Sequence, residues 1–116
     1  MGKEDCIFCR IVKKEIPAKI VYEDNKVLAF EDAKPQAPLH VLIIPKYHVD
    51  RISDLSEESA HIISRMIVAA NMIAEEKNVR DSGYRIVINC NKDAGQAVFH
   101  LHLHLLAGRS LGWPPG

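Results

Sequence analysis

The sequence predicts an α+β domain built on a mostly antiparallel five-stranded sheet with one long and one short helix. Short apolar segments bounded by turn residues recur along the chain, and one longer segment has helical periodicity. Successive strands joined by short turns pair in antiparallel fashion, and a long helix can cover one face of such a sheet. At 116 residues the chain is expected to form one domain over residues 1–116.

The first half of the chain contains the short helix and three of the strands. Apolar residues from Ile7 to Val12 recur at helical spacing, which predicts a short helix there. Segments 19–22 and 27–30 have the composition of strands, and the polar residues 23–26 between them predict a hairpin. A third strand is expected over 39–44, between two prolines.

The second half contains the long helix and the last two strands. Ser56 is placed to cap the helix, and the helix is expected to end near Asn78. Strands are expected over 84–89 and over the segment that begins at His100. The helix has an apolar stripe made of Ile62, Ile63, Met66, Ile67, Ala70, Ile73 and Ala74.

Composition narrows the class of partner and the compartment. Fifteen basic and fifteen acidic residues balance, so charge gives no reason to expect binding to nucleic acid or to a membrane. The first residues lack the apolar core of a signal peptide. Three cysteines without an export signal predict reduced thiols in the cytoplasm, with a nuclear location also open.

Three histidines at alternate positions, His100, His102 and His104, form the most informative motif. A strand projects alternate side chains from one face, so we expect three aligned imidazoles there and the apolar residues between them on the other face. Near neutral pH an imidazole can be a nucleophile, an acid, a base or a metal ligand. On pattern alone three such residues can also hold zinc, as in some hydrolases, or have a structural role.

Aligned imidazoles suit chemistry on a phosphoryl group. A neutral ring nitrogen of His102 can attack phosphorus, while a proton on His104 stabilises charge on the phosphoryl oxygens. Gly95 lets the backbone approach a ligand closely, and the amides of Gln96 and Ala97 can form an anion-binding nest. The glycine-containing turn and the histidine row together predict an oxyanion site.

The pattern His-φ-His-φ-His-φ-φ, where φ is apolar, is the signature of the histidine-triad (HIT) superfamily of nucleotide hydrolases and transferases. The sequence resembles this family from about residue 5 to its last residue. In the transferase branch a glutamine replaces the last histidine, so His104 favours hydrolysis. Segments that resemble the Hint branch of the family are 7–8, 15–19, 30–32, 35–38, His40, 44–46, 95–96 and 112–116.

This resemblance implies a purine nucleoside phosphoramidase, which cleaves the P–N bond of adenosine or guanosine 5′-phosphoramidates. It implies that His102 forms a covalent nucleotidyl-histidine, that His104 and Asn89 contact the phosphate, and that His100 and His40 give supporting hydrogen bonds. A dinucleoside polyphosphate hydrolase of the same superfamily and a low-activity nucleotide-binding scaffold remain alternatives.

The resemblance also implies a nucleoside pocket. Asp32 would accept from the ribose hydroxyls, because one carboxylate can accept from both hydroxyls of a cis-diol. An apolar slot suits a flat base, although the aliphatic residues of this slot, taken alone, are better explained as core. The slot would comprise Ile7, Phe8, Ile11, Ile16 and Phe30.

Three further expectations concern a metal, the dimer and residue 97. Cys6 and Cys9 form a Cys-x-x-Cys pair, which alone fits either a zinc site or two unconnected thiols. The resemblance implies a structural zinc completed by His48 and His100. It also implies a homodimer with one continuous sheet, in which the tail 108–116 and its Trp113 pack near the partner or the active site; otherwise the tail folds back on its own protomer.

Ala97 departs from the Hint pattern, which has a serine just after Gly-Gln. The resemblance assigns that serine hydroxyl to phosphate binding and to departure of the amine. Alanine keeps the backbone N–H but has no hydroxyl. We therefore expect phosphate binding to survive and amine departure to be slower.

Overall fold

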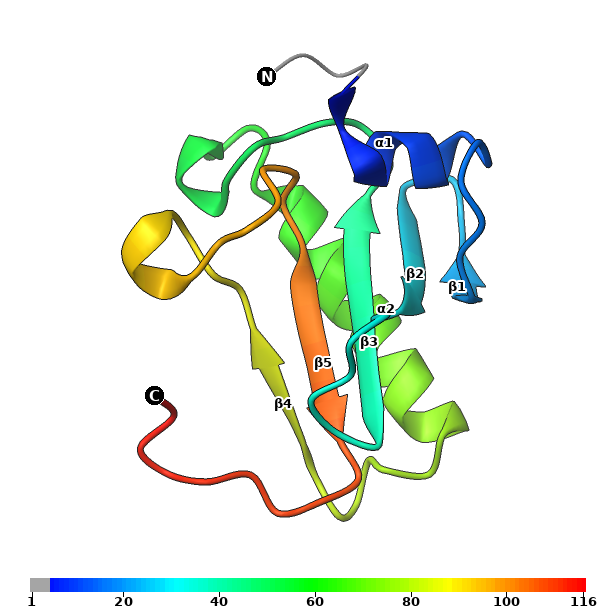
Figure 1. Cartoon of the computed structure of the whole chain (residues 1–116), viewed down its shortest axis with the longest axis vertical. Helices are drawn as coiled ribbons and strands as arrows, with labels where there is room; N and C mark the ends of the chain where they lie inside the picture. The colour runs from blue at the N-terminus through cyan, green and yellow to red at the C-terminus, as the bar shows by residue number, and fades with distance from the viewer. Residues whose placement is uncertain (1–4) are drawn as a thin grey trace.

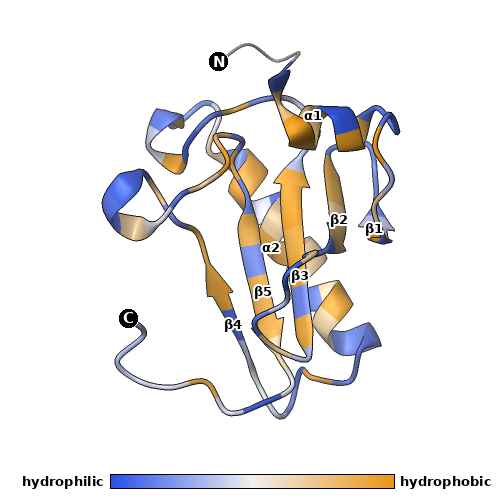
Figure 2. Cartoon of the chain, in the orientation of Figure 1, coloured by the Kyte–Doolittle hydropathy of each residue, from blue (hydrophilic) through white to orange (hydrophobic). Residues whose placement is uncertain are grey.

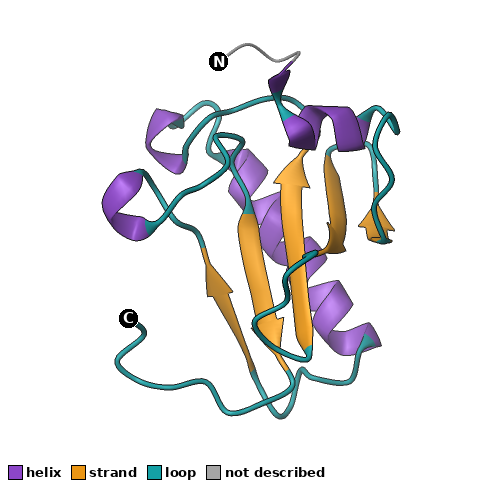
Figure 3. Ribbon diagram, viewed as in Figure 1, coloured by secondary structure: helices purple, strands orange, loops and turns teal. Residues whose placement is uncertain are grey.

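The computed structural model describes residues 5–116, and the predicted α+β fold with its five-stranded antiparallel sheet is confirmed. The strand order is β1-β2-β3-β5-β4, and every neighbouring pair is antiparallel (Figures 1 and 3). The strands are β1 (Ile20–Glu23), β2 (Val27–Glu31), β3 (Leu39–Pro45), β4 (Tyr84–Val87) and β5 (Leu103–Ala107). The helices are α1 (Ile7–Val12) and α2 (His61–Glu76), with single 3-10 turns η2 (Ile52–Asp54) and η3 (Lys92–Ala94).

The two faces of the sheet are covered to different extents. Helix α2 lies along one face, where alternate residues of β2, β3 and β5 form the larger apolar core with it (Figures 1 and 2). On the other face, α1 reaches only β2 and β3, where a second cluster contains Phe8, Leu28 and Leu42. Residues of β5 on that face are therefore only half-buried, which leaves room for a site beside the short helix.

The boundaries of the long helix differ from the prediction. Ser56 does not cap it, because residues 57–60 form a separate turn in which the Ala60 amide donates to the Ser56 carbonyl at 2.8 Å. Ile67 is 39% exposed and lies outside the apolar stripe, whereas Met66 is fully buried. The stripe is narrower than predicted because only one side of α2 faces the sheet.

The histidine segment also differs from the prediction, because β5 begins at Leu103. His100 and His102 precede the strand, and the amide of Leu101 donates to the carbonyl of Val49 at 2.6 Å instead of to a neighbouring strand. The alternation itself persists: Leu101, Leu103 and Leu105 belong to the core under α2, and the histidines face the opposite side.

The tail beyond Gly108 has no regular secondary structure (Figure 3). Arg85 on β4 donates to the Gly112 carbonyl at 2.8 Å, but Trp113 is 83% exposed. The indole therefore does not pack on its own protomer. None of the helices in the described range is long and apolar enough to cross a membrane.

Candidate active site and metal centre

A cavity of about 930 Å³ opens where α1 leaves the sheet uncovered. His102 and His104 lie on its wall, and two lysines that sequence reasoning missed, Lys19 and Lys34, also line it. His40, His100 and Gln96 do not line the cavity. The other predicted residues that line it are Ile7, Phe8, Ile11, Ile16, Phe30, Asp32, Asn89, Gly95 and Ala97.

The hydrogen bond of His102 determines which of its ring nitrogens is free. Nδ1 of His102 lies 2.7 Å from the carbonyl oxygen of His100. A carbonyl only accepts, so Nδ1 carries the hydrogen and Nε2 of the neutral ring keeps its lone pair. The ring is 8% exposed and contacts the Phe8 ring edge-on, with centroids 5.3 Å apart. His102 thus presents an unprotonated nitrogen beside a cavity, as a nucleophile requires.

His40 and His104 form a directional chain of hydrogen bonds. The backbone amide of Gln36 donates to Nδ1 of His40 at 3.0 Å, so the hydrogen of neutral His40 is on Nε2. That nitrogen lies 2.9 Å from Nδ1 of His104, which therefore accepts. The hydrogen of neutral His104 is then on Nε2, which makes its outer nitrogen a donor for an anionic ligand.

Burial keeps the imidazoles of His40 and His104 neutral. Burial lowers the pKa of His104 to about 4, with the neighbouring His102 and His40 acting in the same direction. Burial likewise lowers the pKa of His40, although the Asp32 carboxylate opposes this shift. At pH 7 the pair therefore donates and accepts as neutral imidazoles.

The residues predicted to form the base slot, together with Asp32, line this cavity. Phe8 and Phe30 meet edge-to-face with centroids 5.5 Å apart, and both are almost fully buried. Ile7 is 48% exposed at the rim, a position suited to a ligand contact, whereas Ile11 belongs to the small core. One Asp32 oxygen accepts from the Lys34 amide at 2.8 Å, and the other lies 3.4 Å from Nε2 of His40.

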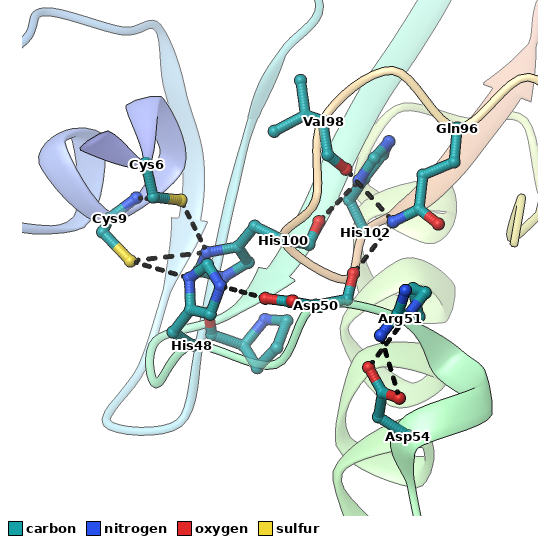
Figure 4. Close-up of polar contacts among 11 residues, drawn as sticks. Cys6, Cys9, His48, Asp50, Arg51, Asp54, Gln96, Val98, His100 and His102 are labelled. Atoms are coloured by element: carbon teal, nitrogen blue, oxygen red, sulfur yellow. Dashed lines mark hydrogen bonds and ion pairs between the residues drawn. The ribbon is translucent and has the colours of Figure 1, made fainter. Parts of the chain in front are cut away.

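The turn around Gly95, between β4 and β5, offers backbone rather than side-chain groups to the cavity. Gly95 has φ +84°, a left-handed conformation that favours glycine, and its backbone N–H closes the turn by donating to the Lys92 carbonyl at 3.0 Å. Gln96 is buried and its side chain points away from the cavity, toward the carbonyls of Asp50 and Val98 (Figure 4). A side-chain contact between Gln96 and phosphate is therefore not available in this arrangement.

Four donor atoms converge at the other end of the histidine segment. Cys6, which caps the start of α1, and Cys9 within α1 point toward the rings of His48 and His100, and the four potential ligand atoms lie within 4.8 Å of one another (Figure 4). The sulfur–Nδ1 distances are 3.3 Å for Cys6–His100, 3.3 Å for Cys9–His48 and 3.6 Å for Cys9–His100. Tetrahedral zinc would separate sulfur and nitrogen ligands by about 3.5 Å.

The protonation of both imidazoles fits a metal. Nε2 of His48 donates to the Asp50 carboxylate at 2.5 Å, and Nε2 of His100 donates to the Pro45 carbonyl at 2.8 Å. Both unprotonated Nδ1 atoms therefore face the thiols. Each of the two imidazoles also has, on its other nitrogen, the hydrogen-bond acceptor typical of metal-bound histidine. Two sulfurs and two nitrogens with no open position are typical of a structural zinc site.

A second group of donors, Asp32, His40 and His104, does not have this protonation. Nδ1 of His40 accepts from an amide, so the ring nitrogen that faces the group carries a hydrogen. This arrangement suits a relay of hydrogen bonds, from the Gln36 amide through His40 to His104, better than a resident cation. The triad therefore divides: His100 belongs to the Cys-containing group, His104 to the relay, and His102 to neither, which contradicts a zinc hydrolase that uses all three as ligands.

Comparison with known proteins identifies the family. A family model for the HIT domain matches residues 13–111. The chain belongs to the HIT domain family. It is 47% identical over 109 residues to the purine nucleoside phosphoramidase of Escherichia coli K12, covering 94% of this chain and 92% of that protein.

Solved structures of HIT proteins share the fold. A HIT family hydrolase from Legionella pneumophila superposes with a TM-score of 0.94 at 46% identity, covering 97% of this chain and 100% of that one. A histidine triad protein from Clostridium difficile has a TM-score of 0.93 at 47% identity, with 97% of each chain covered. The comparisons support assignment of this chain to the HIT hydrolases.

Stability should depend on pH through His104. Its pKa is near 6.5 when unfolded and about 4 when folded, so the unfolded chain binds the proton more tightly. The contribution to stability is complete above pH 6.5 and is lost as pH falls toward 4. In urea titrations, His104→Gln should lose less stability between pH 7 and pH 5 than the unmodified chain does. Equal losses in the two proteins would contradict the buried neutral imidazole.

Proposed function

We propose that this HIT protein hydrolyses purine nucleoside 5′-phosphoramidates through a covalent nucleotidyl-His102 intermediate. The observation that carries the proposal is the hydrogen bond that Nδ1 of His102 donates to the His100 carbonyl. It leaves Nε2 unprotonated beside the cavity. The E. coli relative of similar length is named for this activity. The apolar residues and Asp32 that line the same cavity suit a nucleoside.

In the first step, Nε2 of His102 attacks phosphorus and the P–N bond breaks. The leaving amine takes up one proton from water, because Ala97 offers no hydroxyl to supply it. Nε2–H of His104 donates to a phosphoryl oxygen, with its orientation held by His40 and the amide of Gln36. A neutral relay aligns this donor without requiring either imidazole to change charge.

In the second step, water attacks the same phosphorus and the P–Nε2 bond breaks. One proton is released, the nucleoside 5′-monophosphate departs, and His102 returns to its starting tautomer. The His100 carbonyl accepts from Nδ1 throughout, so it stabilises the positive charge that the ring carries while Nε2 is bonded to phosphorus. Asn89 and the amide of Ala97 lie on the wall where they can hold the phosphoryl oxygens.

Replacement of the nucleophile provides the direct test of this function. His102→Asn should lower single-turnover hydrolysis of an adenosine 5′-phosphoramidate by about 10⁴-fold or more, and rapid-quench mass spectrometry should find no covalent nucleotide. His61→Asn, on the exposed start of α2, is the matched control and should keep full activity. Activity that survives in His102→Asn would favour the scaffold alternative or a different nucleophile.

Ala97 should limit the departure of the amine. Ala97→Ser would restore a hydroxyl beside the phosphate and should raise turnover of alkyl phosphoramidates by about 10 to 100-fold, a range typical of general acid assistance. Affinity for the nucleoside monophosphate product should change little, because the backbone N–H is kept. An unchanged or lower turnover would mean that the hydroxyl is unimportant in this chain.

We further propose that Cys6, Cys9, His48 and His100 hold one structural zinc ion. The group would link α1 to the segment that carries His102, and zinc would supply folding energy there rather than chemistry. Because the ion binds the folded chain, a strong chelator should lower Tm. His48→Ala should weaken zinc binding by more than 100-fold, beyond what loss of an outer-shell partner costs.

The metal content is measured on the purified protein by atomic emission, and Tm by calorimetry. His61→Ala changes a histidine away from the group and should leave both values unchanged. Metal content below half an equivalent after purification with added zinc, or a Tm indifferent to chelation, would contradict this site.

The remaining expectations concern assembly and location. An exposed Trp113 and the uncovered edge strand β4 support a homodimer in which the sheet continues and the tail reaches the partner. Because Trp113 is exposed, we propose that residues 1–116 form a single domain whose tail packs on the partner in the dimer. Reduced cysteine ligands suit the cytoplasm, and the bacterial relatives give no support to a nuclear location.

A further inference from the structure

The carboxamide of Gln96 joins backbone groups of its own loop, 91–98, to the distant segment 48–50. Oε1 accepts from the amide of Asn91 at 2.9 Å, and Nε2 donates to the carbonyls of Asp50 at 2.8 Å and Val98 at 3.1 Å. The residue is 7% exposed. We propose that Gln96 is a positioning residue that couples the metal centre to the nucleotide site, an inference that rests on the function and the zinc site proposed above.

One side of this connection reaches the metal ligands. Asp50, whose carbonyl accepts from Gln96, uses its carboxylate to hold Nε2 of His48 and so directs Nδ1 toward Cys9 (Figure 4). The neighbouring carbonyl of Val49 accepts from the amide of Leu101, within the histidine segment. Displacement of the 48–50 segment would therefore move an outer-shell partner of the metal centre.

The other side reaches the phosphate end of the cavity. Asn91 and Val98 flank the turn that carries Gly95 and Ala97, and Asn89 lies two residues before Asn91; all three of these line the cavity. Asn91 has φ +67° and ψ −171°, an extended positive-φ conformation that is almost confined to glycine and that needs support from its surroundings. Two hydrogen bonds supply that support. The Asn91 amide donates to Oε1 of Gln96, and the backbone amide of Gln96 donates to the Asn91 carbonyl.

Only a carboxamide of this length satisfies all three groups. The site requires one acceptor and two hydrogens, and each of the three partners is a backbone group. Asp50 and Val98 are half-buried, and Asn91 is exposed. A glutamate would place a carboxylate against two carbonyl oxygens, and a methionine would leave all three backbone groups unpaired. Loss of the carboxamide should loosen the metal side and the phosphate side together.

The first test measures zinc affinity with no substrate present. Gln96→Met should weaken zinc binding by about 10-fold, as measured by competition with a chromophoric chelator, although residue 96 contacts no metal ligand side chain. Lys92→Met changes an exposed side chain of the same loop and is the matched control, with unchanged affinity expected. Equal zinc affinity in folded Gln96→Met and in the unmodified chain would overturn the proposal.

The first arm of the second test needs no variant to fold. Zinc affinity of the unmodified chain is measured with and without saturating adenosine 5′-monophosphate, and the nucleotide should tighten zinc binding by at least about fivefold. In Gln96→Met this factor should fall toward one. A factor of one in the unmodified chain, or an undiminished factor in the variant, would overturn the coupling.

These results are separable from the proposed activity. Both tests measure binding, so a chain that couples zinc to the nucleotide but turns over no phosphoramidate would contradict the proposed reaction and leave the coupling intact. An unmodified chain that hydrolyses phosphoramidates with a coupling factor of one would do the reverse.

Discussion

The hydrogen bond from Nδ1 of His102 to the backbone carbonyl of His100 is the interaction on which the rest of the site depends. It determines the tautomer of the central imidazole, and the tautomer determines whether the nitrogen at the cavity can attack phosphorus. This carbonyl belongs to His100, whose own ring faces the cysteines. A single backbone carbonyl therefore orients His102 from a residue whose own ring is held by Cys6 and Cys9.

Alternation along one short segment explains how three identical residues acquire three roles. His100 contributes Nδ1 to the sulfur-containing group, His102 presents Nε2 to the cavity, and His104 accepts from His40 and turns a donor outward. In each case the partner of one ring nitrogen is a group that can only accept or only donate, or a ring already fixed by such a group, so the proton on the other nitrogen follows. The leucines between them pack under α2 and keep the spacing rigid.

The sequence alone was sufficient for the features that depend on local pattern. The α+β class, the β1–β2 hairpin, most residues of the cavity wall and the members of the Cys-containing group follow from periodicity, spacing or family motif. Features that depend on distant backbone were missed or wrong: Ser56 does not begin α2, Ile67 is exposed, and His102 precedes β5. The roles of Gln36 and Asp50 were equally invisible, because no pattern in the sequence records which ring nitrogen faces a backbone amide or carboxylate from another segment.

The tautomer of His102 can be measured directly by long-range ¹H–¹⁵N correlation NMR of the imidazole rings at pH 7.5, with His102→Asn used to assign the signals. The account predicts a neutral ring with the hydrogen on Nδ1 and an unprotonated, pyridine-like Nε2. A signal with the hydrogen on Nε2 would contradict it, because the nitrogen that faces the cavity would then have no lone pair for phosphorus.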